Sequence, residues 1–198
     1  SWSILRMLDY IEIEGLVKSR EKESRFIHSL GVVEVSRLLA SRFNLDVREA
    51  EIDGIYHDAY RYDGGEEAIA LVENQGFEVF PEERKNPMLL HGALAALNFE
   101  KDCGSPVPFS MKLAVRHHTL GHKEMGKLGA VLYIADYTEK GRKHLGDEDR
   151  KRIFSRPTLE AMVMEIIDMQ RPYMKKEGIK EAEVTTELYS YLEKGMEL

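Results

Sequence analysis

The chain of 198 residues carries a formal net charge of −7, and 43% of its residues are hydrophobic and 32% are charged. This composition supplies enough apolar side chains for a sizeable core and excludes an intrinsically disordered chain. The acidic balance also excludes broad, non-specific binding to nucleic acid, because counterion release needs a cationic surface. A small anionic substrate stays compatible with this charge where metal ions and nearby arginines compensate it.

The first segment of the chain and its cysteine content indicate the cellular compartment. The first 17 residues, SWSILRMLDYIEIEGLV, are interrupted by charged side chains, which excludes a secretory signal and a membrane span there. The one cysteine, Cys103, cannot form an internal disulfide, which fits a reducing compartment. We therefore expect a cytoplasmic protein without a membrane partner, in which Cys103 is a packing residue rather than a nucleophile.

Apolar residues recur at spacings of three and four, and no long run alternates with period two, which predicts an all-α bundle of about eight or nine helices. Asp46 and Glu49 form a capping-box variant at one helix start, and Asn86-Pro87 suits another. The helices are expected over residues 2–18, 23–43, 46–58, 66–75, 86–99, 108–118, 125–140, 157–177 and 181–195.

The later helices leave some alternatives open. The run AVLYIA (130–135) by itself also fits a buried strand, but no neighbouring segment offers it a partner strand. Pro172 is expected to kink the eighth helix. Apolar stripes on the last two helices fit either a core or a dimer surface, so a monomer and a homodimer are both compatible with them. These stripes contain Met162, Ile166, Ile167, Leu188 and Tyr191.

Histidines and aspartates fall at apolar places on several expected helices. The histidines are His28, His57, His91, His117 and His118, and the aspartates are Asp58 and Asp136. Each histidine alone fits a hydrogen-bonded packing residue. Together these residues would leave many buried polar groups, which a metal centre satisfies at once. Imidazole and carboxylate ligands without cysteine favour Fe, Mn, Zn, Ni or Co over Ca or Mg.

The spacing of these residues limits how they can bind metal. Adjacent His57 and Asp58 lie ~100° apart around a helix, so both reach one ion only near a helix end or bend. Gly64-Gly65 stops the helix shortly afterwards. With the His117/His118 pair counted as one, these residues offer six ligands. Six exceed what one ion with an open position uses, which points to two ions, ~3.5–4 Å apart, with a bridging carboxylate.

Five motifs occur in a fixed order: RFIHSLGV (25–32), YHDAYR (56–61), LLHG (89–92), RHHTLG (116–121) and LYIADYTEKGR (132–142). Their order resembles the HD superfamily of metal-dependent phosphohydrolases, and within it the YqeK-type symmetrical bis(5'-nucleosyl)-tetraphosphatases. The resemblance implies a single all-α HD domain over residues 1–198. Its motif core spans 25–142, between helical flanks at 1–24 and 143–198.

The resemblance also implies the ligands and the cofactor. His28, His57, Asp58 and Asp136 match the residues that hold the first metal of the superfamily. His91 and His118 match the additional ligands of the dinuclear subgroup, with Asp58 as the bridge. The implied cofactor is a pair of transition-metal ions, usually iron, with Mn, Ni, Co or Zn as alternatives.

The implied reaction is hydrolysis of diadenosine tetraphosphate to two ADP through a metal-bound hydroxide, with Asp58 and Arg61 as catalytic residues. The expected partner is thus a small nucleotide. Thr119 and Glu139 also fit a position behind the ligands, and Tyr56, Tyr60 and Tyr137 fit either an adenine stack or the core. Substrate contacts are expected from Arg25, Arg61, His117, Thr119, Glu139 and Arg142.

Four residues depart from the family pattern. Arg61 stands where lysine is usual, which keeps the charge but cannot release a proton near neutral pH. Leu120, His122 and Lys140 replace a threonine, an arginine and a proline in regions expected to face phosphate or nucleoside. The ligands are untouched, so the substrate is the open question. Another nucleotide or phosphate ester, or a non-catalytic nucleotide-binding module, are the alternatives.

Overall fold

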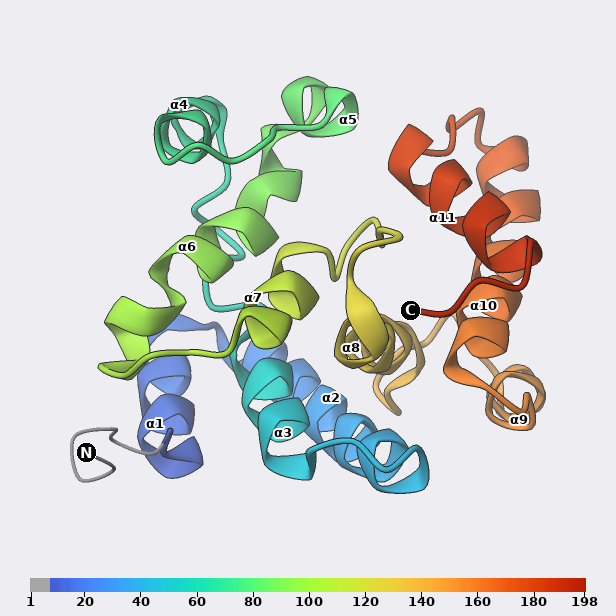
Figure 1. Ribbon diagram of the computed structural model, residues 1–198, viewed down its shortest axis with the longest axis horizontal. Coiled ribbons are helices and arrows are strands. Elements are labelled where there is room, and N and C mark those ends of the chain that lie inside the picture. Colours follow the sequence, from blue (N-terminus) through green and yellow to red (C-terminus); the bar gives the residue numbers. More distant parts are fainter. Residues whose placement is uncertain (1–7) are drawn as a thin grey trace.

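The structure, a computed structural model that describes residues 8–198, confirms the all-α class (Figure 1). Eleven α-helices and one 3-10 helix, and no strand, are found within that range. AVLYIA lies inside a helix. The α-helices are α1 (Tyr10–Arg20), α2 (Glu23–Arg42), α3 (Val47–Tyr56), α4 (Glu66–Asn74), α5 (Pro81–Lys85), α6 (His91–Cys103), α7 (Phe109–Arg116), α8 (Gly126–Thr138), α9 (Asp147–Phe154), α10 (Leu159–Lys176) and α11 (Glu183–Glu193), and η2 (Pro87–Leu90) is the 3-10 helix.

Two short helices, α5 and α9, do not appear among the expected segments. Their sequences, PEERK and DEDRKRIF, contain too few apolar residues for a hydrophobic period to be counted. Local capping marks their starts instead. The backbone N–H of Phe80 donates to the Glu83 carboxylate (2.9 Å), and that of Gly146 donates to the Asp149 carboxylate (3.1 Å).

Several expected helix ends were wrong by a few residues. The first helix begins at Tyr10, because the Asp9 side chain accepts the N–H of Ile11 and caps it there. Residues 2–7 of that prediction lie outside the described residues. The third helix ends at Tyr56 rather than Asp58. The predicted kink is not tested, but α10 continues past Pro172 to Lys176.

Helix α8 is the centre of the packing, between α2 and α7 on one side and α10 on the other (Figure 1). Its residues 129–135 are all buried, so it is apolar on every face, which explains why this run also resembled a buried strand. The stripes on α10 and α11 pack into an apolar cluster with α8, as expected for a core. Met162, Ile166, Ile167 and Leu188 are fully buried there.

Close helix packing brings the ends of α3, α6 and α7 together. A Cβ at Gly54 in α3 would lie 3.2 Å from the backbone of Val33 in α2, so glycine permits this approach. A Cβ at Gly92 in α6 would lie 2.9 Å from the carbonyl oxygens of Val115 and Arg116 at the end of α7. His57, His91 and His118, which are close in sequence to these contacts, are thereby placed near one another.

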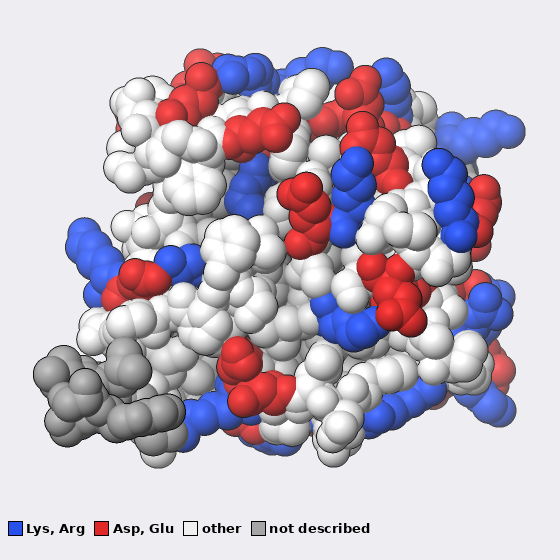
Figure 2. Space-filling view, viewed as in Figure 1, with Lys and Arg blue, Asp and Glu red and all other residues white. Residues whose placement is uncertain are grey.

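No helix within residues 8–198 is long and apolar enough to cross a bilayer. On the face seen in Figure 2, acidic and basic side chains are interspersed, without a continuous basic area. This face gives no electrostatic reason to expect nucleic acid to bind there.

One buried acid, Asp53 in α3, gives a first prediction. Neither carboxylate oxygen has a hydrogen-bond partner among the described residues, and burial, with a smaller contribution from Glu49, raises the pKa of Asp53 well above its usual range. Between the unfolded pKa of ~3.9 and the raised folded pKa, the folded state holds one more proton. The free energy of unfolding then falls as pH rises, by up to about 1.4 kcal/mol per pH unit.

Asp53→Asn is expected to remove this slope, so the variant gains stability relative to the parent chain as pH increases from 4 towards 9. Urea denaturation at several pH values measures the difference. A stability difference that is constant across this range would contradict the assignment.

Candidate metal centre

The six residues expected as metal ligands lie together where five helices meet. His28 is on α2, His57 is the C-cap of α3 with Asp58 in the following turn, and Asp136 is on α8. His91 is the first residue of α6, and His118 follows the end of α7. Five of the six side chains are buried, and the sixth, Asp136, is 21% exposed. Because the chain leaves the helix at Tyr56, His57 and Asp58 both face the same space.

Three of the histidines are fixed by the same local contact. In each, Nδ1 lies 2.7–2.8 Å from the backbone carbonyl three residues earlier in the chain. A carbonyl only accepts, so Nδ1 carries the hydrogen, and metal-binding Nε2 faces the centre. The pairs are His57 with Gly54, His91 with Met88 and His118 with Val115.

The Nε2 atoms of His91 and His118 lie 3.1 Å apart. Burial is the largest cause that lowers the pKa of both rings, that of His118 to about 3, so both imidazoles are uncharged at neutral pH. With both Nδ1 atoms protonated, two lone pairs point at each other. This repulsive arrangement is stabilised when a cation binds between them.

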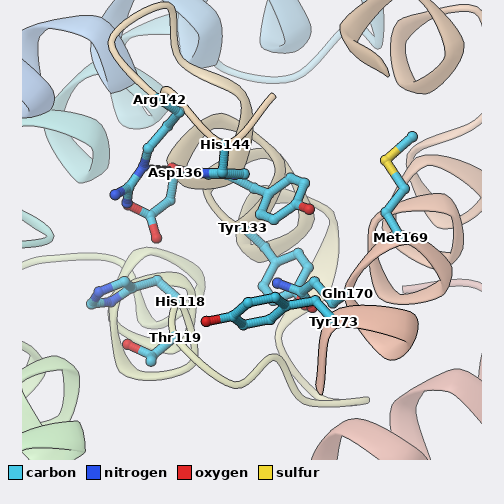
Figure 3. A pocket seen from close by; sticks show the side chains of 10 residues that line it. His118, Thr119, Tyr133, Asp136, Arg142, His144, Met169, Gln170 and Tyr173 are labelled. Carbon is cyan, nitrogen blue, oxygen red and sulfur yellow. Dashed lines mark hydrogen bonds and ion pairs between the residues drawn. The ribbon is translucent and has the colours of Figure 1, made fainter. Parts of the chain in front are cut away.

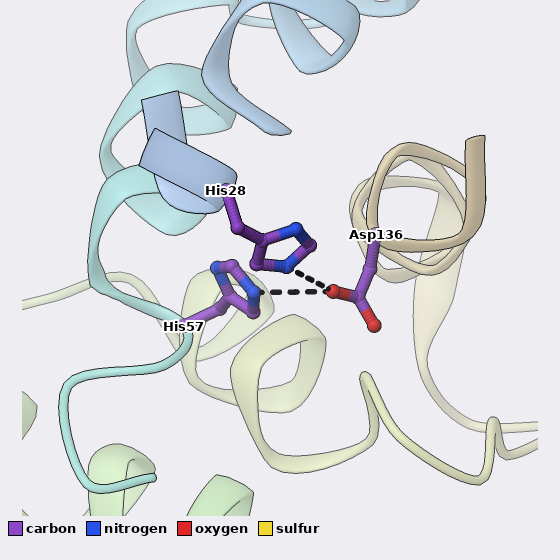
Figure 4. Close-up of side chains that lie close together, drawn as sticks. All are labelled: His28, His57 and Asp136. Atoms are coloured by element: carbon purple, nitrogen blue, oxygen red, sulfur yellow. Dashed lines mark hydrogen bonds and ion pairs between the residues drawn. The ribbon is translucent and has the colours of Figure 1, made fainter. Parts of the chain in front are cut away.

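His28, His57 and Asp136 form a second group of candidate ligands (Figure 4). Nε2 of His28 lies 2.8 Å from Oδ1 of Asp136, and Nε2 of His57 lies 3.3 Å from the same oxygen. Burial alone would lower the pKa of His57, but the carboxylates of Asp58 and Asp136 outweigh it and raise the pKa to about 9. The proton that His57 carries in the metal-free protein is therefore the one that a metal ion would replace.

Asp58 lies between the pair His91 and His118 and the group that contains His57. Its Oδ1 is 3.8 Å from Nε2 of His57, 3.6 Å from that of His91 and 3.9 Å from that of His118. Burial opposes its ionisation, but the positive charges of His57 and Arg25 hold the pKa of Asp58 below its usual range. The other oxygen, Oδ2, accepts hydrogen bonds from the guanidinium of Arg25, with Nε at 2.9 Å.

These residues fit a transition-metal centre. Among the described residues, two groups of three have ligand atoms within 4.8 Å of one another: His28, His57 and Asp136, and His57, Asp58 and His118. Nε2 of His57 is buried and makes no well-aligned hydrogen bond, although Oδ1 of Asp136 lies 3.3 Å away. Neutral imidazoles and ionised carboxylates are the donor set that Fe, Mn, Zn, Ni and Co accept.

Glu139 supports the centre from behind. Its Oε1 accepts a hydrogen bond from Nδ1 of His28 (3.0 Å), and its Oε2 accepts the backbone N–H of Gly141 (2.6 Å). A Cβ at Gly31 would lie 2.4 Å from Oε2, so the glycine of the first motif makes room for this carboxylate. Glu139 thus orients His28, the position behind the ligands that the sequence also allowed, and its predicted substrate contact stays a prediction.

Of the predicted substrate residues, Arg25, Thr119 and Arg142 face the centre, whereas Arg61 is exposed. Arg142 donates to Oδ1 of Asp136 (3.2 Å), and Thr119 Oγ1 lies 3.5 Å from Nε2 of His91. Both face the centre, as Arg25 does. Arg61 is exposed in the turn after Asp58, close enough for its charge to help lower the pKa of His91, after burial and other contributions.

His117, although adjacent to His118, faces a separate cavity of about 260 Å³ beside α6 and α7. Its ring stacks on His122 at 4.4 Å, and both rings stack on Phe80. The predicted substrate contact of His117 stays a prediction, and the structure places this side chain in a different cavity from His118. Phe109, which is 68% exposed, lines the same cavity. We call it the second cavity.

The other three residues that depart from the family pattern lie away from the centre. Leu120 packs with Phe80 and with Ala182 at the start of α11. Lys140 is 85% exposed, with Glu34 at 3.4 Å. His122 belongs to the second cavity. The expectation that these three regions face phosphate or nucleoside stays a prediction.

Two of the three tyrosines considered for stacking belong to the core. The hydroxyls of Tyr56 and Tyr60 donate to Asp102 (2.6 and 2.7 Å), and the ring of Tyr56 stacks on Phe99. Tyr137 instead lines a cavity of about 550 Å³ that includes proposed ligands (Figure 3). We call it the main cavity. It is lined by His118, Thr119, Tyr133, Asp136, Tyr137, Arg142, His144, Met169, Gln170 and Tyr173.

Comparison with known proteins agrees with this geometry. The HD domain family model matches residues 25–141. The protein named symmetrical bis(5'-nucleosyl)-tetraphosphatase in Bacillus subtilis is 29% identical over 165 residues, which cover 83% of this chain and 88% of that protein. The protein of the same name in Staphylococcus aureus is 30% identical over 158 residues, covering 76% and 77% of the two chains.

A crystal structure from Clostridium acetobutylicum, described as a "predicted HD superfamily hydrolase involved in NAD metabolism", superposes with a TM-score of 0.85. It is 31% identical, and the match covers 96% of this chain and 100% of that one. The fold, the order of motifs and the relatives agree. The chain therefore belongs to the HD domain family, as a phosphohydrolase similar to the symmetrical bis(5'-nucleosyl)-tetraphosphatases.

Proposed function

We propose that the protein cleaves diadenosine tetraphosphate symmetrically into two ADP at a dinuclear metal centre. The observation that carries this proposal is the pair of uncharged imidazoles, His91 and His118, with Nε2 atoms 3.1 Å apart. A bound cation would satisfy both lone pairs, while His28, His57 and Asp136 offer a second position for an ion. The names of the relatives supply the substrate class, a dinucleoside tetraphosphate.

In this proposal, His28, His57 and Asp136 would hold one ion and His91 and His118 would hold the other, and Asp58, which lies near both sets, would contribute to the same centre. When bound, such ions lower the pKa of coordinated water towards neutrality and neutralise charge on phosphoryl oxygens. We further propose iron as the metal. The donor set accepts several transition ions, so metal analysis of freshly purified protein tests this point.

The arginines bind and orient the polyphosphate. Arg142 and Thr119 lie in the main cavity beside Asp136 and His118, where they can donate hydrogen bonds to phosphate oxygens. Arg25 fixes one oxygen of Asp58. Arg61 adds positive charge near His91 but cannot act as an acid near neutral pH, so its role is electrostatic.

Hydrolysis of diadenosine tetraphosphate by the metal-loaded protein is expected to give ADP as the sole nucleotide product. Chromatography of the products, with several other nucleotides assayed in parallel, measures this. AMP plus ATP, or turnover of a different nucleotide only, would support a phosphohydrolase of another specificity. Binding without turnover of any nucleotide would instead indicate a non-catalytic module.

Three broader expectations join this proposal. We propose that residues 1–198 form a single HD domain, with a motif core at 25–142 and helical flanks on either side. We propose that the protein acts in the cytoplasm on a small nucleotide and not on nucleic acid. Its state as a monomer or a homodimer is measured by light scattering during size-exclusion chromatography.

A further inference from the structure

The main cavity extends from the proposed metal centre to residues that the proposed chemistry does not use. Its volume of about 550 Å³ is that of a small-molecule site. One end carries charged and polar groups of His118, Thr119, Asp136 and Arg142. His144 lies beside Asp136 and Arg142, whereas Met169, Gln170 and Tyr173 line the cavity from α10, and Tyr133 and Tyr137 line it from α8 (Figure 3). A nucleotide has the same polarity, with charged phosphates at one end and a flat base at the other.

Beyond its charged end, the cavity presents rings that a base can stack on. The rings of Tyr137 and His144 have centroids 4.7 Å apart and are tilted by 53°. Tyr173 extends from α10 into the cavity, with its hydroxyl end turned to the side of His118 and Thr119 (Figure 3). It is 61% exposed, so a large aromatic ring faces water unless a ligand covers it. Stacking on such rings stabilises any base, because it requires no particular pattern of hydrogen-bond donors.

Helix α10 holds this wall firmly. Ile166 and Ile167 are fully buried against α8, which fixes the helix that carries Met169, Gln170 and Tyr173. The Tyr133 hydroxyl donates to Oε1 of Gln170 at 3.5 Å. With Oε1 held in this way, the amide N–H groups of Gln170 are the donors left for an acceptor on a base.

We propose that this end of the main cavity binds the nucleoside of one substrate half, with Tyr173 stacking on the base and Gln170 donating a hydrogen bond to it. The inference rests on the proposed function and deepens it. It places nucleoside recognition on α10, outside residues 25–141 that match the HD domain model. Phosphate binding and nucleoside binding then depend on different parts of the chain.

Tyr173→Ala is expected to weaken ADP binding about tenfold, as for loss of a base stack, while binding of inorganic pyrophosphate is unchanged. Isothermal titration calorimetry on the metal-loaded protein measures both affinities. The KM for diadenosine tetraphosphate rises by a similar factor, and kcat stays within about twofold, because the ring acts on binding. Tyr173→Trp keeps a stacking surface and is expected to retain ADP affinity.

Phe109→Ala is the matched control, because Phe109 is an exposed aromatic residue of the second cavity. It is expected to leave ADP binding unchanged. Loss of ADP binding in Phe109→Ala but not in Tyr173→Ala would move the base to the second cavity and overturn the proposal. Equal losses of ADP and pyrophosphate in Tyr173→Ala, or no loss of either, would also overturn it.

The result is separable from the proposed function. If the parent protein binds ADP through Tyr173 but does not cleave diadenosine tetraphosphate, the nucleoside site stands and the proposed reaction fails. If it cleaves this substrate with the same KM in Tyr173→Ala, the reaction stands and the nucleoside site fails. A Gln170→Leu variant with unchanged ADP affinity would remove Gln170 from the proposal while the stack on Tyr173 is judged on its own.

Discussion

His57→Ala is expected to purify without its full metal complement and to lose hydrolysis. Its buried Nε2 atom belongs to both candidate groups of ligands. Loss of a bound ion removes several kcal/mol of charge stabilisation in the transition state, which is about a thousandfold or more in rate. Metal analysis by mass spectrometry and the product assay measure the two effects together.

The matched control is His122→Ala, since His122 stacks in the second cavity and does not face the centre. This variant should retain both metal and activity. If His57→Ala keeps a full metal content, His57 is not a ligand. The centre would then have to be reassigned to the remaining histidines.

Asp58→Asn is expected to have an effect of comparable size. Its Oδ1 is within 4 Å of Nε2 of three histidines, so the carboxylate is placed to be shared by two ions. The amide keeps the shape and removes the negative charge. We therefore expect fewer than two metal equivalents per chain and a loss of activity of about a thousandfold.

Asp53→Asn provides the control for this change on the same segment of the chain. Asp53 is equally buried, but its carboxylate has no hydrogen-bond partner among the described residues and belongs to neither group of candidate ligands. The control should keep metal and activity. Normal metal content in Asp58→Asn would show that Asp58 does not bridge, and the shared-ligand proposal would be abandoned.

Most long helices could be predicted because their apolar faces repeat with the helical period. α10 and α11 are examples, since their stripes are buried as expected. The failures have a local cause. α5 and α9 are short and charged, so that capping by Glu83 and Asp149, rather than burial, defines where they begin.

The candidate site was predictable to the extent that it depends on residue types at helix ends. A histidine at a helix end can bind its own backbone three residues back, and this contact needs no distant partner. The sequence allowed a position for Glu139 behind the ligands, but only the structure shows that it orients His28, because the two are 111 positions apart. Nor could the sequence show that the side chains of His117 and His118, although adjacent in the chain, face different cavities.

The sequence by itself determined the helical class and the set of imidazole and carboxylate side chains, because periodicity and side-chain chemistry are local properties. Only the tertiary structure decided which of these side chains share a space. It brought Asp58 between His57, His91 and His118 through the close packing that Gly54 and Gly92 permit. It also placed α10 against α8, which gives the main cavity a wall that no motif indicates. Packing between distant segments is set by the shapes of many side chains at once, and no short stretch of sequence contains that information.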